Sequence, residues 1–105
     1  MTNGFTPAEV KKMIDINENF VLLDVRNPDE WKECSIDARQ VVYISLPELR
    51  DKIRTLPKEK KIITFCRSSV RAYQAQNILK GAGFSNTAFM DGSILAWPYD
   101  DCVRK

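Results

Sequence analysis

Two short apolar runs set the main constraint on the fold of this 105-residue chain. One is Phe20 to Val25, and the other is the Ile62 to Cys66 part of "KKIITFC". A strand with one face in water alternates apolar and polar side chains, whereas a strand covered on both faces is apolar for most of its length. Both runs are therefore expected to be inner strands of a parallel sheet.

Helix signals lie between and around these runs. Thr6, Pro7 and Glu9 have the pattern of a helix N-cap, a first-turn proline and a capping box. We expect helices starting at Thr6, over Pro28 to Glu33, over Leu46 to Leu56 before Pro57, and from Val70 or Arg71 to Leu79, with Gly81 or Gly83 as its cap. We expect further strands at Gln40 to Leu46 and Asn86 to Gly92, and a closing helical turn at Ser93 to Asp101.

This alternation of strands and helices predicts an α/β fold, a parallel sheet with helices on both faces. There is no internal repeat, low-complexity segment or linker. We therefore expect one domain over residues 1–105, with a core at about 5–99.

Composition excludes several kinds of function. The net charge of +2, from 16 basic and 14 acidic residues, does not favour nucleic acid or a membrane surface. The N-terminal segment has no apolar core of a signal peptide, so we expect a cytoplasmic protein. The chain has no histidine, which excludes a Ser-His-Asp triad and a Cys-His pair. Three scattered cysteines without a CxxC motif do not suggest a zinc site, and we expect no metal or cofactor.

Cys66 lies at the carboxyl end of an expected strand, where parallel sheets bind their ligands. The following turn contains Arg67 and Arg71, and its N–H groups and the start of the next helix add partial positive charge. Each of these features favours the thiolate form of a cysteine over the thiol. Cys66 is thus a candidate nucleophile that needs no histidine. The alternative is a buried cysteine that only fills space at a strand end.

Four segments resemble the rhodanese-type sulfurtransferase family, in order and over nearly the whole chain. "CRSSVR" resembles the family's Cys-Arg-Ser-Gly-x-Arg active-site loop. The other three segments that match are "LLDVRNPDEW" (Leu22 to Trp31), "LPKEKKIITFCRSS" and "LKGAGFSNTAFMDGSILAW" (Leu79 to Trp97). The resemblance implies a rhodanese-like fold with a central five-stranded, mostly parallel sheet.

The same resemblance implies the reaction and its residues. A sulfane sulfur would pass from a donor such as thiosulfate to cyanide or a thiol, through a persulfide on Cys66. Arg67, Ser68, Ser69, Val70 and Arg71 would line the substrate cradle, with Arg71 holding the anionic donor or closing the loop. Asp24 and Arg26 would support the site or brace the sheet. The expected partners are a small sulfur donor and acceptor, and also a redox or sulfur-carrier protein; we expect a monomer.

Other readings remain open. Cysteine-dependent phosphatases keep five residues between cysteine and arginine, whereas only four separate Cys66 from Arg71, so a phosphatase or arsenate reductase ranks lower. Ser69 and Ser93 replace glycines that are common in the family, which favours a second hypothesis: a sulfur-carrier or interaction module that a partner persulfidates. Cys34 would resolve a persulfide if its sulfur lay close to Cys66, or would only fill the place of a glycine.

Overall fold

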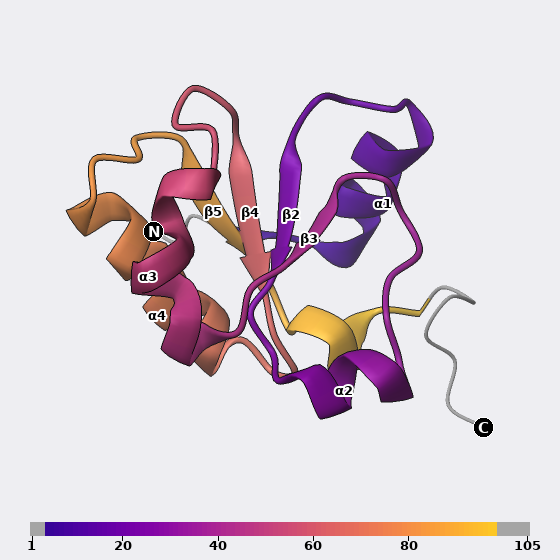
Figure 1. The fold of residues 1–105 in the computed structure, drawn as a ribbon. Helices are drawn as coiled ribbons and strands as arrows, with labels where there is room; N and C mark the ends of the chain where they lie inside the picture. Colours follow the sequence, from indigo (N-terminus) through magenta and orange to yellow (C-terminus); the bar gives the residue numbers. More distant parts are fainter. Residues whose placement is uncertain (1–3, 99–105) are drawn as a thin grey trace.

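The computed structural model describes residues 4–98, which form a five-stranded sheet with helices on both sides (Figure 1). The strand order is β1-β5-β4-β2-β3, and all four strand pairs are parallel. The strands are β1 (Gly4–Phe5), β2 (Val21–Asp24), β3 (Val41–Tyr43), β4 (Ile62–Phe65) and β5 (Thr87–Met90). The helices are α1 (Pro7–Asp15), α2 (Pro28–Glu33), α3 (Leu49–Lys52) and α4 (Val70–Gly81), with 3-10 turns η1 (Leu46–Glu48), η2 (Ile53–Thr55) and η3 (Ser93–Ala96). None of the helices in this described part is long and apolar enough to cross a membrane.

The two faces of the sheet bury separate apolar clusters. Leu23 and Ile62 point to the side of α3 and α4, where they meet Leu49, Ala75 and other buried side chains. On the other face, neighbouring strand positions such as Leu22 and Ile63 pack with Val10 and Met13 of α1. Every residue of β2 and β4 is buried, as expected for inner strands covered on both sides.

The connections after β2 and β4 diverge. β2 continues through α2 to β3 on one side, whereas β4 continues through α4 to β5 on the other. The carboxyl ends of β2 and β4 are therefore adjacent at a topological switch point, the usual ligand position in open parallel sheets. Cys66 directly follows β4, and Arg26 follows β2 by two residues.

Most of the expected elements are confirmed. The helix at Thr6 has its capping box: Thr6 N donates to Glu9 Oε1 (2.8 Å) and Glu9 N to Thr6 Oγ1 (3.1 Å). α2 occupies Pro28–Glu33 as expected, and α4 starts at Val70. After α4 the backbone reverses at Gly83, whose φ of +95° suits glycine.

The expected single helix over Leu46 to Leu56 was wrong. The segment divides into η1, α3 and η2, and its last turn, η2, has 3-10 geometry. The Thr55 hydroxyl donates to the Lys52 carbonyl (2.7 Å), while Leu56 N donates to Ile53 O instead (3.2 Å). The threonine thus takes the acceptor that α-helical geometry would have given to Leu56.

Other elements also differ from the sequence analysis; for example, β5 is Thr87–Met90 rather than Asn86 to Gly92, and α4 ends at Gly81 rather than Leu79. β3 is shorter than the expected Gln40 to Leu46, because Leu46 begins η1. The two-residue edge strand β1 was not predicted separately, although the family resemblance implied a fifth strand. The closing turn is η3 over Ser93–Ala96, and the end of the expected segment at Asp101 lies outside the described residues, as does Cys102.

Candidate active site

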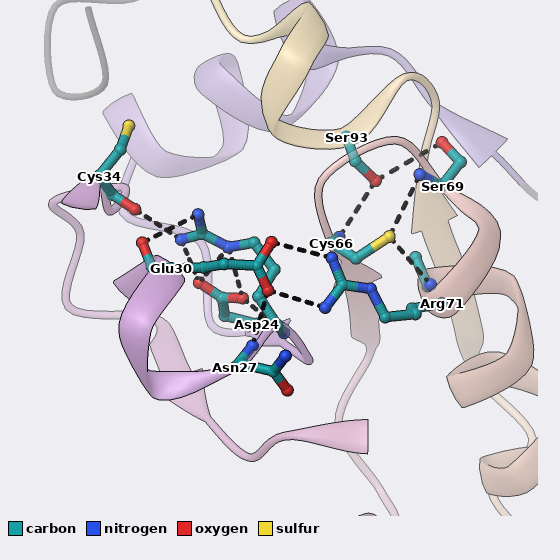
Figure 2. Close-up of polar contacts among 10 residues, drawn as sticks. Asp24, Asn27, Glu30, Cys34, Cys66, Ser69, Arg71 and Ser93 are labelled. Atoms are coloured by element: carbon teal, nitrogen blue, oxygen red, sulfur yellow. Dashed lines mark hydrogen bonds and ion pairs between the residues drawn. The ribbon is translucent and has the colours of Figure 1, made fainter. Parts of the chain in front are cut away.

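The sulfur of Cys66 accepts hydrogen bonds from the backbone of the loop that follows it. Ser69 N donates to Sγ (3.2 Å), and so does Ala72 N in the first turn of α4 (3.3 Å) (Figure 2). Helix N-termini leave such N–H groups without an intrahelical acceptor. The side chain of the N-cap residue Ser69 makes no capping bond, so the sulfur caps this helix. This arrangement stabilises negative charge on sulfur, although Cys66 is 1% exposed and also packs with the α4-side core.

The turn η3 holds the backbone of the loop from behind. Ile94 N donates to Cys66 O (3.0 Å), and Leu95 N donates to Arg67 O (3.0 Å). In a trans peptide the N–H points opposite to the C=O, and the described residues have no cis peptide. The N–H groups of Arg67 and Ser68 therefore point away from η3. This leaves two more donors for an anion bound in the loop.

The loop itself is exposed except at its base. Arg67, Ser68 and Val70 are exposed, whereas Ser69 is half-buried. Ser69 has a φ of +95°, a left-handed conformation that costs a non-glycine residue about 1 kcal/mol. The serine at this loop position thus keeps a conformation that glycine would adopt more readily.

Arg71 does not lean over the loop but pairs with Glu30 of α2. Its Nη1 and Nη2 donate to Glu30 Oε1 (2.8 Å) and Oε2 (3.0 Å), and both side chains are partly buried. Glu30 Oε1 also accepts from Asn27 N (2.9 Å), the N-cap position of α2. The hydrogen bonds from Arg71 lower the pKa of Glu30 from 4.5 to about 2, although burial opposes the shift, and the same pair raises the pKa of Arg71.

Asp24 and Arg26 form a buried ion pair at the end of β2. Arg26 Nη2 lies 2.7 Å from Asp24 Oδ2, and Nε donates to Oδ1 (3.0 Å). The guanidinium also donates to the carbonyls of Glu30 (3.3 Å) and Cys34 (2.6 Å). These contacts connect the end of β2 to the middle of α2, at Glu30, and to its C-cap residue, Cys34. Arg26 thereby orients the helix that carries Glu30.

A cavity of about 360 Å³ opens next to the loop. It is lined by Arg26, Glu30, Glu33, Cys34, Arg67, Ile94 and Leu95. Three exposed apolar side chains, Val70, Tyr73 and Leu95, belong to the loop's helix and to η3 on either side of the loop. The mouth of the site is thus partly charged and partly apolar.

The structure brings Cys66, Arg67, Ser68, Ser69 and Val70 into one loop, with Arg71 at its end. Asp24 and Arg26 lie at the neighbouring strand end and contact α2 rather than the sulfur. The sulfur of Cys34 points away from Cys66 (Figure 2).

Glu30 and Ser93 were missed as site residues. The capping-box position of Glu30 was the available signal for its orientation, but nothing in the sequence named Arg71 as its partner.

Comparison with known proteins shows the family and the fold of the chain. The protein-family model described as the rhodanese-like domain matches residues 6–99 of this chain. The chain belongs to the rhodanese-like family. It is 33% identical over 90 residues to the putative sulfurtransferase YtwF of Bacillus subtilis, covering 86% of this chain and 84% of that protein. A rhodanese-like domain protein from Staphylococcus aureus has the same fold, with a TM-score of 0.85 at 20% identity and coverage of 100% of this chain and 99% of that one.

A longer relative carries the same domain. The chain is 34% identical over 92 residues to the probable adenylyltransferase/sulfurtransferase MoeZ of Mycobacterium tuberculosis, covering 88% of this chain. It spans only 24% of the length of MoeZ. The shared segment is therefore the rhodanese-like domain, and these sulfurtransferase relatives assign the chain to a family of sulfur-transfer proteins.

Proposed function

We propose that this rhodanese-like protein is a sulfurtransferase that carries a sulfane sulfur on Cys66. The observation that supports this most directly is the pair of backbone N–H groups, of Ser69 and Ala72, that converge on the Cys66 sulfur. These donors stabilise negative charge on the sulfur, and the exposed residues Arg67 and Ser68 leave the open side of the loop accessible to a small anionic group. A cysteine that only filled space would not require this convergence.

In the first half-reaction the Cys66 thiolate attacks the outer sulfur of thiosulfate. The sulfur–sulfur bond of the donor breaks, sulfite leaves with the electron pair, and Cys66 becomes a persulfide anion. In the second half-reaction cyanide or a thiolate attacks the terminal sulfur of the persulfide. The acceptor keeps that sulfur, and the bonding electrons return to Cys66 as thiolate.

The loop residues have different roles in this proposal. The N–H groups of Arg67 and Ser68, which point away from η3, stabilise the terminal sulfur of the persulfide. The exposed side chain of Arg67 receives the anionic donor at the cavity. Arg71 contributes less to donor binding than its charge suggests, because Glu30 already engages both of its terminal nitrogens.

One observation favours a second candidate, a sulfur carrier loaded by a partner protein. The Glu30 carboxylate offsets the charge of Arg71, which weakens attraction for a dianion such as thiosulfate. The exposed Val70, Tyr73 and Leu95 next to the loop suit contact with a protein more than with a small anion. In this alternative Cys66 still becomes a persulfide, but thiosulfate is a poor donor.

Intact mass spectrometry of the reduced protein incubated with thiosulfate tests the proposal. We expect a gain of one sulfur atom that disappears when cyanide is added. The Cys66→Ser variant should show no gain, and Cys34→Ser should behave as wild type. No gain in a protein whose Cys66 still reacts with iodoacetamide would reject thiosulfate transfer and leave the carrier hypothesis. A gain that survives in Cys66→Ser would contradict the assignment of the nucleophile.

A further inference from the structure

Two serines close to Cys66 adopt backbone conformations that disfavour any side chain. Among the described residues, positive φ at a non-glycine position occurs at Asn17, Ser69 (+95°) and Ser93 (+51°). Ser69 and Ser93 lie 24 residues apart in the sequence, yet their hydroxyl oxygens are 3.5 Å apart. Side chains at such positions cost stability, so the contacts that they make need explanation.

The Ser93 hydroxyl binds the backbone of the nucleophile. Its oxygen accepts a hydrogen bond from Cys66 N (3.1 Å) and donates to Met90 O (3.2 Å), the last residue of β5. Both Ser93 and Cys66 are at most 1% exposed. Glycine or alanine at position 93 has no acceptor there, so the buried Cys66 N–H would lose this partner.

The Ser69 hydroxyl extends this contact to the sulfur side of the loop. It lies 3.4 Å from Met90 O and next to the Ser93 hydroxyl, while Ser69 N donates to Cys66 Sγ. The hydrogen bonds form a ring that starts at Cys66 N, passes through the two hydroxyls, and returns to Cys66 Sγ through Ser69 (Figure 2). The ring therefore holds the nucleophile at both its backbone and its sulfur.

We propose that Ser93, together with Ser69, is a positioning residue for Cys66. The two hydroxyls fix the end of β4 against the end of β5, in the conformation in which the loop N–H groups meet the sulfur. The consequence for sulfur transfer rests on the proposed function, whereas the positioning itself does not. Each hydroxyl has one proton: that of Ser93 goes to Met90 O, and the ring is closed when that of Ser69 goes to Ser93 Oγ (3.5 Å) rather than to Met90 O (3.4 Å).

Three variants separate the hydroxyl from the backbone conformation. Ser93→Ala removes the hydroxyl and keeps the left-handed cost, whereas Ser93→Gly removes both. Ser35→Ala is the matched control, because Ser35 is also a serine that donates to a carbonyl, that of Trp31, and no hydrogen bond among the described residues joins it to the Cys66 loop. Amide hydrogen exchange of the reduced protein, read by NMR at Cys66 and Ser69, reports positioning without any sulfur donor.

We expect exchange at Cys66 N–H to be at least tenfold faster in both Ser93 variants than in wild type or Ser35→Ala. Exchange at Ser69 N–H should also rise, because it belongs to the same ring. A role in stability alone predicts a different result: Ser93→Gly would behave better than Ser93→Ala, and Ser69 would not respond. Equal exchange rates in wild type and both Ser93 variants would overturn the inference.

Single-turnover transfer of sulfur from the persulfidated protein to cyanide gives the second readout. We expect it to slow at least fivefold in Ser93→Ala and Ser93→Gly, and not in Ser35→Ala. If wild type forms no persulfide, the proposed function fails while the exchange experiment still decides the positioning role. If wild type forms the persulfide and the Ser93 variants transfer sulfur at its rate, the positioning role fails and the proposed function stands.

Discussion

At the scale of single residues, Glu30 links the helix α2 to the nucleophile's loop. It receives two hydrogen bonds from Arg71 and one from Asn27 N, so its side chain is oriented from both sides. A bidentate pair between arginine and a carboxylate is geometrically specific as well as favourable. Glu30 therefore sets where Arg71, and with it the start of α4, lies relative to β2.

The Glu30–Arg71 ion pair leads to a prediction about how the stability of the fold depends on pH. The pKa of Glu30 is lowered in the folded protein to about 2, from 4.5, so the pair stabilises the fold fully above about pH 5. This contribution is lost as the pH falls toward 2, because the carboxyl then takes up a proton. We expect Glu30→Gln to be less stable than wild type by about 1 kcal/mol at pH 7, and the difference to vanish near pH 2.

Urea unfolding of both proteins between pH 2 and pH 7 measures this difference. Glu59→Gln, an exposed carboxylate on the turn before β4, serves as the control and should show no comparable dependence. A Glu30→Gln difference that persisted unchanged at pH 2 would show that the charge of Glu30 is not what stabilises the pair.

The residues of the site differ in how far the sequence predicts them. Cys66 and its loop could be proposed as a site from the sequence, because the apolar strand, the thiol and the arginines are contiguous. The partners of that loop are not contiguous. Glu30 precedes Arg71 by 41 residues and Ser93 follows Cys66 by 27, so only the packing of α2 and η3 brings them together.

At the scale of elements, the short turn η3 matters more for the site than its four residues suggest. Its backbone N–H groups at Ile94 and Leu95 bind the carbonyls of Cys66 and Arg67, which fixes the direction of the loop's own donors. The sequence analysis expected a helical turn there but gave it no role. A backbone contact of this kind has no side-chain signature.

Leu95→Pro tests the backbone contact between η3 and the Cys66 loop, because proline removes the N–H that donates to Arg67 O. We expect sulfur transfer by Leu95→Pro to be at least tenfold slower than by Leu95→Ala, which loses the exposed side chain but keeps the N–H. Steady-state assays with thiosulfate and cyanide compare the two, after circular dichroism has confirmed that both are folded. Equal rates would mean that the Leu95–Arg67 bond does not orient the loop for transfer.

Element types were predicted better than element lengths. The inner strands and α1, α2 and α4 followed from apolar runs and capping residues, which are local signals. The 3-10 turn η2, which ends the segment from Leu46 to Leu56, involves one threonine hydroxyl that competes for a helix carbonyl. The edge strand β1 has two residues and pairs with β5, more than 80 positions later, so the local sequence is too short to reveal it.

At the scale of the whole molecule, the topology places the site where the two halves of the sheet diverge. β2 and β4 are paired up to Asp24 and Phe65, so residues that stabilise the end of β2 also affect the position of the end of β4. Asp24 and Arg26 lie at this point, buried between the sheet and α2. Their effect on function is therefore expected to come through the fold.

Asp24→Asn tests whether Asp24 stabilises the fold. The substitution keeps the size of the side chain but leaves the Arg26 charge buried without its carboxylate. Breaking a buried pair in this way is expected to cost about 3 to 5 kcal/mol. The double variant Asp24→Asn with Arg26→Met, which leaves no unpaired charge, should recover part of that loss. Urea unfolding at pH 7 measures both.

The same variants decide how Asp24 acts on the nucleophile. If Asp24 is structural, the folded fraction of Asp24→Asn, measured well below its unfolding midpoint, should alkylate at Cys66 within about threefold of the wild-type rate, since no hydrogen bond joins Asp24 to the sulfur among the described contacts. A large loss of Cys66 reactivity in a fully folded variant would instead assign Asp24 an electrostatic role at the site. Asp24 would then act on Cys66 through its charge as well as through its effect on the fold.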